Sequence, residues 1–384
     1  MTTMTLDAAF LLNPTVSLPR NTLAPFVDMG ALQPFTRDVR AVSLKPYAGG
    51  AKFLDGDVLM ARITPSLENG KTAIYRAAQG EPGPAFGSTE FIVIRGRKGL
   101  SDSRFAYYLV TSPEVRERAI ATMNGSSGRQ RVQHDAFASF LIDLPSVEEQ
   151  CAIADTLGAL DDKIESNRRA QAIGEELIRS LVTAALEGST GGIGVLGDYC
   201  RLIKDPARNS ALTEDLHYIG FEHMPRGSIF LDSWGTAAGL GSDKSYFQSG
   251  DVLFGKLRPY FKKVGIAPVN GVCSTDILVL RPKLEGDAAI VAVVASSDTL
   301  IDSLSAAATG TRMPRASWKD LSNWPVVILT AVERSALAEQ VAPLLKKLTL
   351  LTHESNRLRL TRDTLLPELV SGRIRVPEAA EALG

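Results

Sequence analysis

The chain has 384 residues, a formal net charge of −1, 45 % hydrophobic residues and 22 % charged residues. The length fits two or more domains, and the composition is that of a folded protein, which excludes a disordered chain, a collagen and a coiled-coil fibre. The longest apolar run, Ala288 to Ala295, is too short to cross a bilayer. Met1 to Leu12 lack the basic segment of a secretory signal, so we expect a cytoplasmic protein.

Cysteine content and net charge narrow the possibilities further. Cys151, Cys200 and Cys273 are far apart and fit neither a zinc spacing nor a disulfide framework. The near-neutral charge argues against a uniformly basic surface, although it leaves room for a local basic groove.

In chain order, the first long matched segment runs from Phe53 to Pro65, and it matches Phe247 to Pro259, 194 residues later. Both segments contain Gly-Asp-Val-Leu, and Arg62 aligns with Lys256. At the same offset, Val27-Asp28 matches Phe221-Glu222. A Gly-Asp turn followed by apolar residues predicts a strand, and we expect strands at residues 57–63 and 251–257.

Further matches follow in the same order. Ser88-Thr89-Glu90 and the apolar run after it match Ser274-Thr275-Asp276 and its run, and Gly128 pairs with Gly310, each beside arginines. Four ordered matches indicate a tandem duplication with a period near 190 residues. The apolar runs predict buried strands. Residues 105–120 predict one helix.

Each repeat ends in a long helix with an apolar heptad seam. The spacing alternates between four and three residues, which is the pattern of a coiled coil, and Asn167, Gln171, Ser355 and Arg362 interrupt it with polar side chains that could fix the register. Pro343 should kink or restart the second helix, and Pro367 with Gly372 should end it. A helix lying on its own globule is the alternative, but two matched seams, one on an acidic helix and one on a slightly basic helix, favour packing against each other. The seam residues are Ile153, Leu157, Leu160, Ile164, Leu337, Val341, Leu344 and Leu348.

Catalytic motifs are weak in this sequence. Gly250 to Leu257 nearly fits a phosphate-binding loop, but Leu257 replaces the hydroxyl residue, and the repeat copy has Ala61 in place of Gly255. His217 and His223 lack a third residue at metal-ligand spacing. We therefore expect no catalysis, no metal and no cofactor in this chain.

Basic residues recur at matched positions. In an alternating strand, Arg62 would share a face with Val58 and Met60, as Lys256 and Arg258 would with Phe254. Arginine suits contacts to phosphate and to guanine. We therefore take as candidate DNA-binding residues Arg62, Arg129, Arg131, Lys256, Arg258, Lys262, Lys263, Arg312 and Arg315, together with Ser88, Thr89, Ser274 and Thr275.

With these motifs in order, the chain resembles the specificity subunits of Type I restriction-modification enzymes over nearly its whole length. The similarity rests on the Gly-Asp-Val-Leu blocks and the Ser-Thr pairs, on Tyr218 to Glu222, on Leu144-Pro145 with Glu149-Gln150, on Leu160 to Glu165 and on Leu366 to Gly372. The start of the first globule, Thr2 to Leu12, matches poorly, and Glu333-Arg334 stands where the first helix has Glu149-Gln150.

The resemblance implies an α+β fold of two tandem target-recognition globules, each followed by a long helix, with the helices in an antiparallel coiled coil. It implies a non-catalytic subunit that binds a bipartite site on double-stranded DNA and docks two modification (methyltransferase) subunits, and restriction or translocase subunits where these exist. S-adenosylmethionine and ATP with magnesium would belong to the partners. The expected divisions are a first recognition domain at 1–145, a spacer helix at 146–187, a linker at 188–195, a second recognition domain at 196–329, a second spacer helix at 330–372 and a tail at 373–384.

Two other functions stay open at this point. The chain could be a two-domain enzyme with an unrecognised active site between its halves, or a coiled-coil adaptor whose globules bind no DNA. Salt-dependent binding to random duplex DNA separates the DNA-recognition subunit from these two alternatives.

Overall fold

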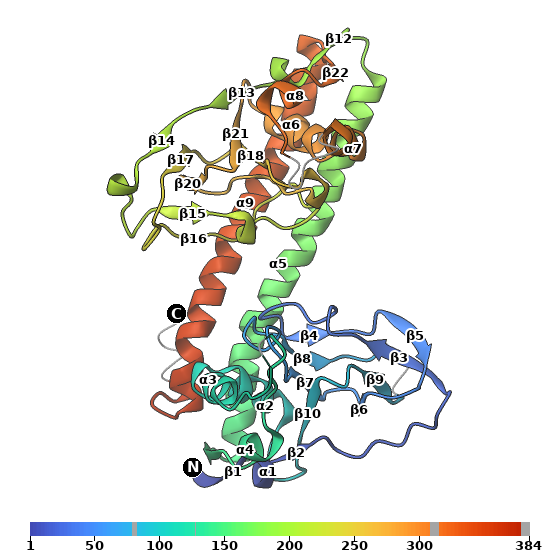
Figure 1. Ribbon diagram of the computed structural model, residues 1–384, viewed down its shortest axis with the longest axis vertical. Coiled ribbons are helices and arrows are strands. Elements are labelled where there is room, and N and C mark those ends of the chain that lie inside the picture. Colours follow the sequence, from blue (N-terminus) through green and yellow to red (C-terminus); the bar gives the residue numbers. More distant parts are fainter. Residues whose placement is uncertain (79–82, 127, 308–314, 378–384) are drawn as a thin grey trace. The chain divides into compact units, whose positions relative to one another are not determined.

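A computed structural model describes residues 1–78, 83–126, 128–307 and 315–377 (Figure 1). Two compact units make up the chain: unit 1 holds Met1–Asp162 with Leu358–Gly384, and unit 2 holds Lys163–Arg357. Each unit therefore combines one globule with a segment of both long helices. The predicted linker at 188–195 also includes a strand, β12 (Ile193–Val195), that pairs with the end of the second globule.

Unit 1 contains mixed strands and short helices, as the α+β prediction requires. Its elements are β1 (Thr2–Thr5), α1 (Leu6–Ala9), β2 (Phe10–Leu12), β3 (Leu23–Val27), β4 (Asp38–Val39), β5 (Ser43–Pro46), β6 (Ala51–Phe53), β7 (Val58–Ala61), β8 (Thr72–Tyr75), β9 (Ala85–Gly87), β10 (Phe91–Gly96), α2 (Ser103–Thr111), α3 (Pro113–Ala121), α4 (His134–Ala138), β11 (Leu141–Leu144) and the start of α5 (Val147–Gly188).

Unit 2 repeats this order with additional short turns. After β12 come the 3₁₀ turn η1 (Leu196–Asp198), β13 (Cys200–Ile203), β14 (Pro206–Ala207), η2 (Asn209–Ala211), β15 (His217–Ile219), η3 (Phe221–His223), β16 (Gly235–Thr236), β17 (Lys244–Phe247), β18 (Val252–Gly255), η4 (Pro259–Phe261), β19 (Val264–Ile266), β20 (Gly271–Ser274), β21 (Ile277–Pro282), α6 (Asp287–Ala295), α7 (Asp298–Ala307), α8 (Trp318–Ser322), β22 (Pro325–Val327) and α9 (Ala331–Val370).

The sheets of the two units have corresponding strand orders. Unit 1 has β2-β10-β7-β8-β4 and β5-β3-β9-β6, and unit 2 has β13-β21-β18-β19 and β14-β17-β20-β15-β16. The first two strands of unit 1 have equivalents in unit 2, because β1 pairs with β11 as β12 pairs with β22, and β2 pairs with β10 as β13 pairs with β21. The poor sequence match at Thr2 to Leu12 therefore conceals equivalent strands.

Strand pairing corrects one of the sequence matches. Val27 is opposite Gly87, and Ile219 is opposite Cys273. Since Gly87 and Cys273 hold the same place in their β9 and β20 strands, Val27 corresponds to Ile219 and not to Phe221.

The repeated Gly-Asp-Val-Leu block has a structural explanation. Gly56 and Gly250 have φ angles of +83° and +89°, a conformation that glycine adopts without strain. The aspartate that follows is buried, and an arginine donates two hydrogen bonds to it: Arg95 to Asp57, both at 2.6 Å, and Arg281 to Asp251, both at 2.8 Å. The block is thus a turn that leads into a core strand.

Two helix predictions need correction. The helix expected at 105–120 is two helices, α2 and α3, because the chain turns at Ser112 and restarts at Pro113, where a missing N–H costs nothing. In contrast, α9 continues through Pro343 and Pro367. Among the described residues no single helix is long and apolar enough to cross a membrane; α6 and α7 would suffice only as a pair, and they are bent by 50°.

Residues from both long helices lie in the core of each unit. In unit 1, Ile153 and Leu157 of α5 share a cluster with Leu365 and Leu369 of α9. In unit 2, the α5 residues Ile178 and Val182 share a cluster with Leu337, Val341 and Leu348 of α9. Leu160 and Leu344 pack partly against these clusters, and Ile164 is half-buried. In unit 2, Asn167 of α5 contacts Ser355 of α9 and Gln171 contacts Thr352, so rising α5 numbers face falling α9 numbers and the two helices are antiparallel there.

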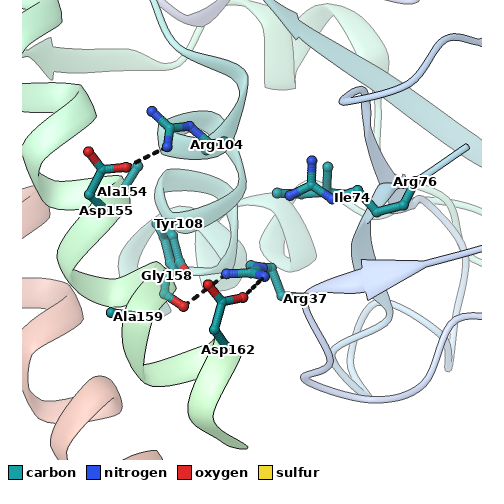
Figure 2. Close-up of a pocket in the computed structure, with 10 residues that line it drawn as sticks. All are labelled: Arg37, Ile74, Arg76, Arg104, Tyr108, Ala154, Asp155, Gly158, Ala159 and Asp162. Carbon is teal, nitrogen blue, oxygen red and sulfur yellow. Dashed lines mark hydrogen bonds and ion pairs between the residues drawn. The ribbon is translucent and has the colours of Figure 1, made fainter. Parts of the chain in front are cut away.

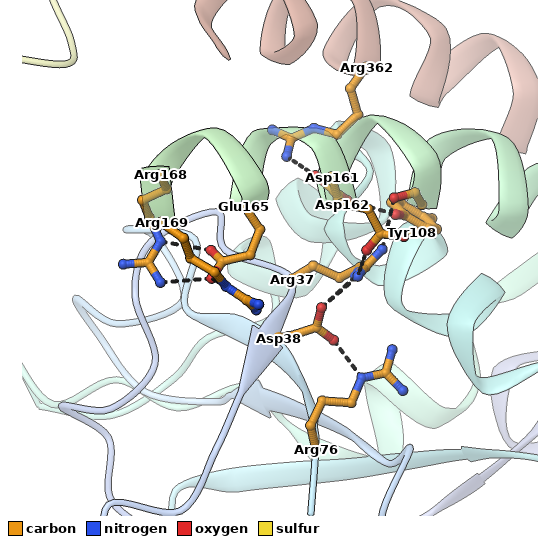
Figure 3. A network of polar contacts seen from close by, with 11 residues as sticks. Arg37, Asp38, Arg76, Tyr108, Asp161, Asp162, Glu165, Arg168, Arg169 and Arg362 are labelled. Atoms are coloured by element: carbon orange, nitrogen blue, oxygen red, sulfur yellow. Dashed lines mark hydrogen bonds and ion pairs between the residues drawn. The ribbon is translucent and has the colours of Figure 1, made fainter. Parts of the chain in front are cut away.

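Polar pairs interrupt the seam. In unit 2, Asn167 donates to Ser355 at 3.3 Å, and Gln171 donates to Thr352 at 2.6 Å. In unit 1, Arg362 donates to buried Asp161 at 2.6 Å, and the Tyr108 hydroxyl of α2 donates to the same carboxylate at 2.6 Å (Figure 3). Burial and the Asp161 carboxylate raise the pKa of Tyr108, so this hydroxyl stays protonated.

Asp251→Asn should destabilise the protein by about 3 kcal/mol, because it removes the charge from a buried aspartate and leaves Arg281 without its ionic partner. Denaturant unfolding measures the loss. Asp298→Asn is the matched control, since Asp298 is exposed and its pair with Lys262 is worth less than about 1 kcal/mol. Equal effects of the two substitutions would contradict the structural role of the Gly-Asp block.

Arg362→Ile should also cost about 3 kcal/mol, because Asp161 stays buried without its cation. Helix α9 begins 184 residues after α5, so Leu345 of α9 corresponds to Asp161 of α5, and Ile178 of α5 corresponds to Arg362 of α9. Both of these equivalent residues are apolar and pack in the core of unit 2. The triple variant Tyr108→Phe, Asp161→Leu, Arg362→Ile should therefore recover most of the stability in thermal unfolding. A triple variant as unstable as the single one would refute this.

Candidate nucleic-acid interface

A cluster of two cations and one carboxylate lies at one end of the β7–β10 pair in unit 1. Because β7 and β10 are antiparallel, Arg62 after β7 meets Glu90 before β10, and the Arg62 N–H donates to the Glu90 carbonyl at 3.0 Å. Arg131, from the segment before α4, donates to the Glu90 carboxylate from Nη2 at 2.7 Å and from Nε at 3.0 Å. We call Arg62, Glu90 and Arg131 the unit 1 cluster.

Unit 2 has the same arrangement at the matched positions. Lys256 follows β18, and its N–H donates to the Asp276 carbonyl at 2.9 Å. Lys256 Nζ lies 4.0 Å and Arg315 Nη2 lies 3.7 Å from one carboxylate oxygen of Asp276. Isolated bridges place Arg131 beside Ile63 and Arg315 beside Leu257. We call Lys256, Asp276 and Arg315 the unit 2 cluster.

The serine of each Ser-Thr pair builds the turn that presents the carboxylate. Ser88 accepts a hydrogen bond from the Glu90 N–H at 3.1 Å, and Ser274 accepts one from the Asp276 N–H at 3.3 Å. The neighbouring residues Thr89 and Thr275 are exposed. The pairs therefore contribute a turn and an exposed hydroxyl.

Each cluster has one positive charge more than its carboxylate neutralises. Hydrogen bonds from Arg131 lower the pKa of Glu90, so the carboxylate is ionised at neutral pH. The guanidinium groups remain accessible: the side chains of Arg131 and Arg315 are 42 % and 62 % exposed. Arg62 Nε is buried and has no partner among the described residues. A half-exposed arginine beside a carboxylate can exchange it for phosphate oxygens or a base edge.

The strands themselves differ from the prediction. Strand β7 ends at Ala61 and β18 ends at Gly255, and both are buried on both faces. The expected alternating face therefore does not exist, because each strand lies between two layers of core residues. The basic residues stand in the loops that follow.

The other candidate residues fall into three groups. Arg129 and Arg258 are exposed. Lys262 forms an ion pair with Asp298, and Lys263 donates to the Phe221 carbonyl. Arg312 lies outside the described residues.

The sequence analysis missed the roles of Glu90 and Asp276, although both acids were visible after the matched Ser-Thr pairs. It also passed over Arg226 and Tyr260, which lie beside the basic loop of unit 2. No matched residue in the first repeat draws attention to Tyr260, since Ser66 stands in its place.

A cavity of about 310 Å³ lies between α5 and the first globule, all within unit 1 (Figure 2). Arg37 reaches α5 and donates to the Gly158 carbonyl at 3.0 Å and to Asp162 at 2.5 Å. Arg104 donates to Asp155 at 2.5 Å. These contacts of Arg37 and Arg104 with α5 join the first globule to the helix.

The described part of the chain contains no group of three or more His, Cys, Asp or Glu side chains arranged to hold a metal ion. His223 Nδ1 accepts a hydrogen bond from the Gly220 N–H at 3.0 Å, and His217 Nδ1 lies 3.2 Å from the Asn270 carbonyl. Both histidines therefore have structural partners.

Comparison with known proteins adds to this geometry. Residues 35–173 match the family model of the Type I restriction modification DNA specificity domain. The Type I restriction enzyme EcoEI specificity subunit of Escherichia coli is 32 % identical over 112 residues, which are 29 % of this chain and 18 % of that protein. The EcoDI specificity subunit of Escherichia coli is 31 % identical over 144 residues, which are 35 % of this chain and 32 % of that protein. The match thus spans less than a third of these relatives.

A solved structure extends the likeness in fold to the whole chain. The S subunit of a Type-I restriction-modification system from M. genitalium aligns over 96 % of both chains, with a TM-score of 0.57 and 16 % sequence identity. The fold of unit 1 and unit 2 is therefore one that such a subunit adopts. Together with the match at residues 35–173, this supports the resemblance seen in the motifs: residues 35–173 are similar to the Type I restriction modification DNA specificity domain, and the chain has the fold of such an S subunit.

Proposed function

We propose that the chain is a non-catalytic DNA-recognition subunit whose two clusters contact double-stranded DNA. The main observation is that, at the same strand end in both units, a half-exposed arginine pairs with a carboxylate and a second basic residue lies nearby. A cluster that served folding alone would not need a half-exposed guanidinium in each copy. Arginines that contact DNA phosphates position a protein on the duplex, and neighbouring contacts to base edges supply sequence specificity.

Two units with matching clusters imply a target of two parts. The segments around the clusters differ, since the loop after β7 is Thr64-Pro65-Ser66 and the loop after β18 is Arg258-Pro259-Tyr260. Different side chains at an equivalent place recognise different bases. We therefore propose a bipartite site in which each unit binds one half.

The helix pair is the proposed docking surface for two modification subunits, with restriction or translocase subunits as further partners. Ile173 and Leu177 of α5 are 68 % and 45 % exposed and lie one helical turn apart, outside the seam. Exposed apolar residues on one helical face suit a partner protein. In this proposal S-adenosylmethionine, ATP and magnesium are bound by the partners and not by this chain.

Alanine at Arg131 or at Arg315 should weaken binding to random-sequence duplex. Each substitution should reduce the slope of log K against log salt by about one, because one phosphate contact is lost. Glu90→Gln and Asp276→Asn should act in the opposite direction and tighten binding, since each removes a negative charge near the phosphates. Fluorescence anisotropy at several salt concentrations measures both effects.

Lys98→Ala is the matched control. Lys98 is exposed in unit 1 but lies beyond the opposite end of β10 from Glu90. If the arginine variants leave the salt slope as unchanged as Lys98→Ala does, the clusters do not bind DNA. If the wild-type chain shows no salt-dependent binding, the adaptor and enzyme hypotheses replace the recognition subunit.

A further inference from the structure

The loop after β18 contains two non-glycine residues in the left-handed conformation. Arg258 has φ +51° and Lys262 has φ +48°, and they flank the turn η4. Residues other than glycine seldom adopt this backbone conformation, and they keep it only where the surrounding structure holds them in place. They gather at binding and catalytic sites, so the turn warrants a functional explanation.

Several contacts hold this turn in place. The Phe261 N–H donates to the Arg258 carbonyl at 2.9 Å, and the Lys262 N–H donates to the Pro259 carbonyl at 2.7 Å. The Arg226 guanidinium stacks over the Phe261 ring at 4.1 Å. Lys262 pairs with Asp298 of α7. The turn is therefore fixed on two sides within unit 2.

The tip of the turn presents an aromatic ring to solvent. Tyr260 is 50 % exposed, and its ring meets Phe261 edge to face at 4.7 Å between centroids. Arg258 is exposed beside it, and its side chain has no hydrogen bond or ion pair with the described residues. An exposed tyrosine between cations, on a rigid turn, has the composition of a nucleic-acid contact.

Unit 1 lacks these features at the same place. Ser66 replaces Tyr260, Leu67 replaces Phe261 and is fully buried, and Glu68 replaces Lys262. The position of Arg258 is held by Thr64, whose hydroxyl accepts a hydrogen bond from the Gln130 N–H at 3.0 Å. The turn is thus a particular feature of the second unit on a shared framework.

We propose that Tyr260 is a specificity-determining residue, whose ring contacts the bases of the half-site bound by unit 2 while Arg258 contacts the adjoining phosphate or guanine. This inference rests on the proposed function and assigns to one side chain a part of its sequence preference. The ring supplies apolar contact with base edges in the groove, such as the thymine methyl group. The pre-formed turn keeps the ordering cost of that contact low.

Selection from a library of random-sequence duplexes tests the proposal with the full-length chain. The wild type should enrich two specific blocks. Tyr260→Ala should lose base preference in one block only, with about 5- to 100-fold weaker binding to the wild-type consensus. Tyr260→Phe should keep both blocks, because the ring remains. Ser66→Ala, the matched substitution in unit 1, should also keep both.

The outcomes separate this inference from the proposed function. If the wild type enriches two blocks and Tyr260→Ala enriches the same two at equal affinity, Tyr260 does not determine specificity, although the recognition function stands. Loss of both blocks by Tyr260→Ala, with thermal unfolding unchanged, overturns the inference as well. If the wild type enriches nothing, the proposed function itself fails.

Discussion

The packing of α5 against α9 is the constraint on which both units depend. Neither globule completes its core alone, since Leu157 with Leu365 in unit 1 and Ile178 with Val341 in unit 2 belong to the same clusters as the sheet residues. Burial of such side chains is worth about 1.5–3 kcal/mol each. The helices are therefore parts of both folded units, and the polar pairs along the seam favour a single antiparallel register.

Within this frame, the duplicated aspartate–arginine pairs hold the central strands in place. Asp57 with Arg95 and Asp251 with Arg281 join the start of one strand to the end of its neighbour. Each pair holds the start of β7 or β18 against its neighbouring strand, and the basic clusters follow the other end of the same strand. The loops beyond those ends differ between the units in charge and aromatic content, since Thr64-Pro65-Ser66 stands where unit 2 has Arg258-Pro259-Tyr260.

Much of the fold could be predicted from the sequence because local rules agree with the tertiary structure. The duplication, the seam and the Gly-Asp turns all appear as regular patterns. Arg362 in the seam was visible as an interruption, but its partners Asp161 and Tyr108 were not, because they come from distant segments. The candidate residues Arg62 and Lys256 were found from their repetition, whereas Glu90 and Asp276 gained significance only from strand pairing.

The most direct measurement of the central claim is a genome-wide map of methylated bases in a host that expresses this chain together with modification subunits. The account predicts one methylated motif with two specific blocks separated by a spacer of fixed length and no base preference. The motif should disappear when this gene alone is deleted. A single uninterrupted block, or methylation that persists without the gene, would contradict the account.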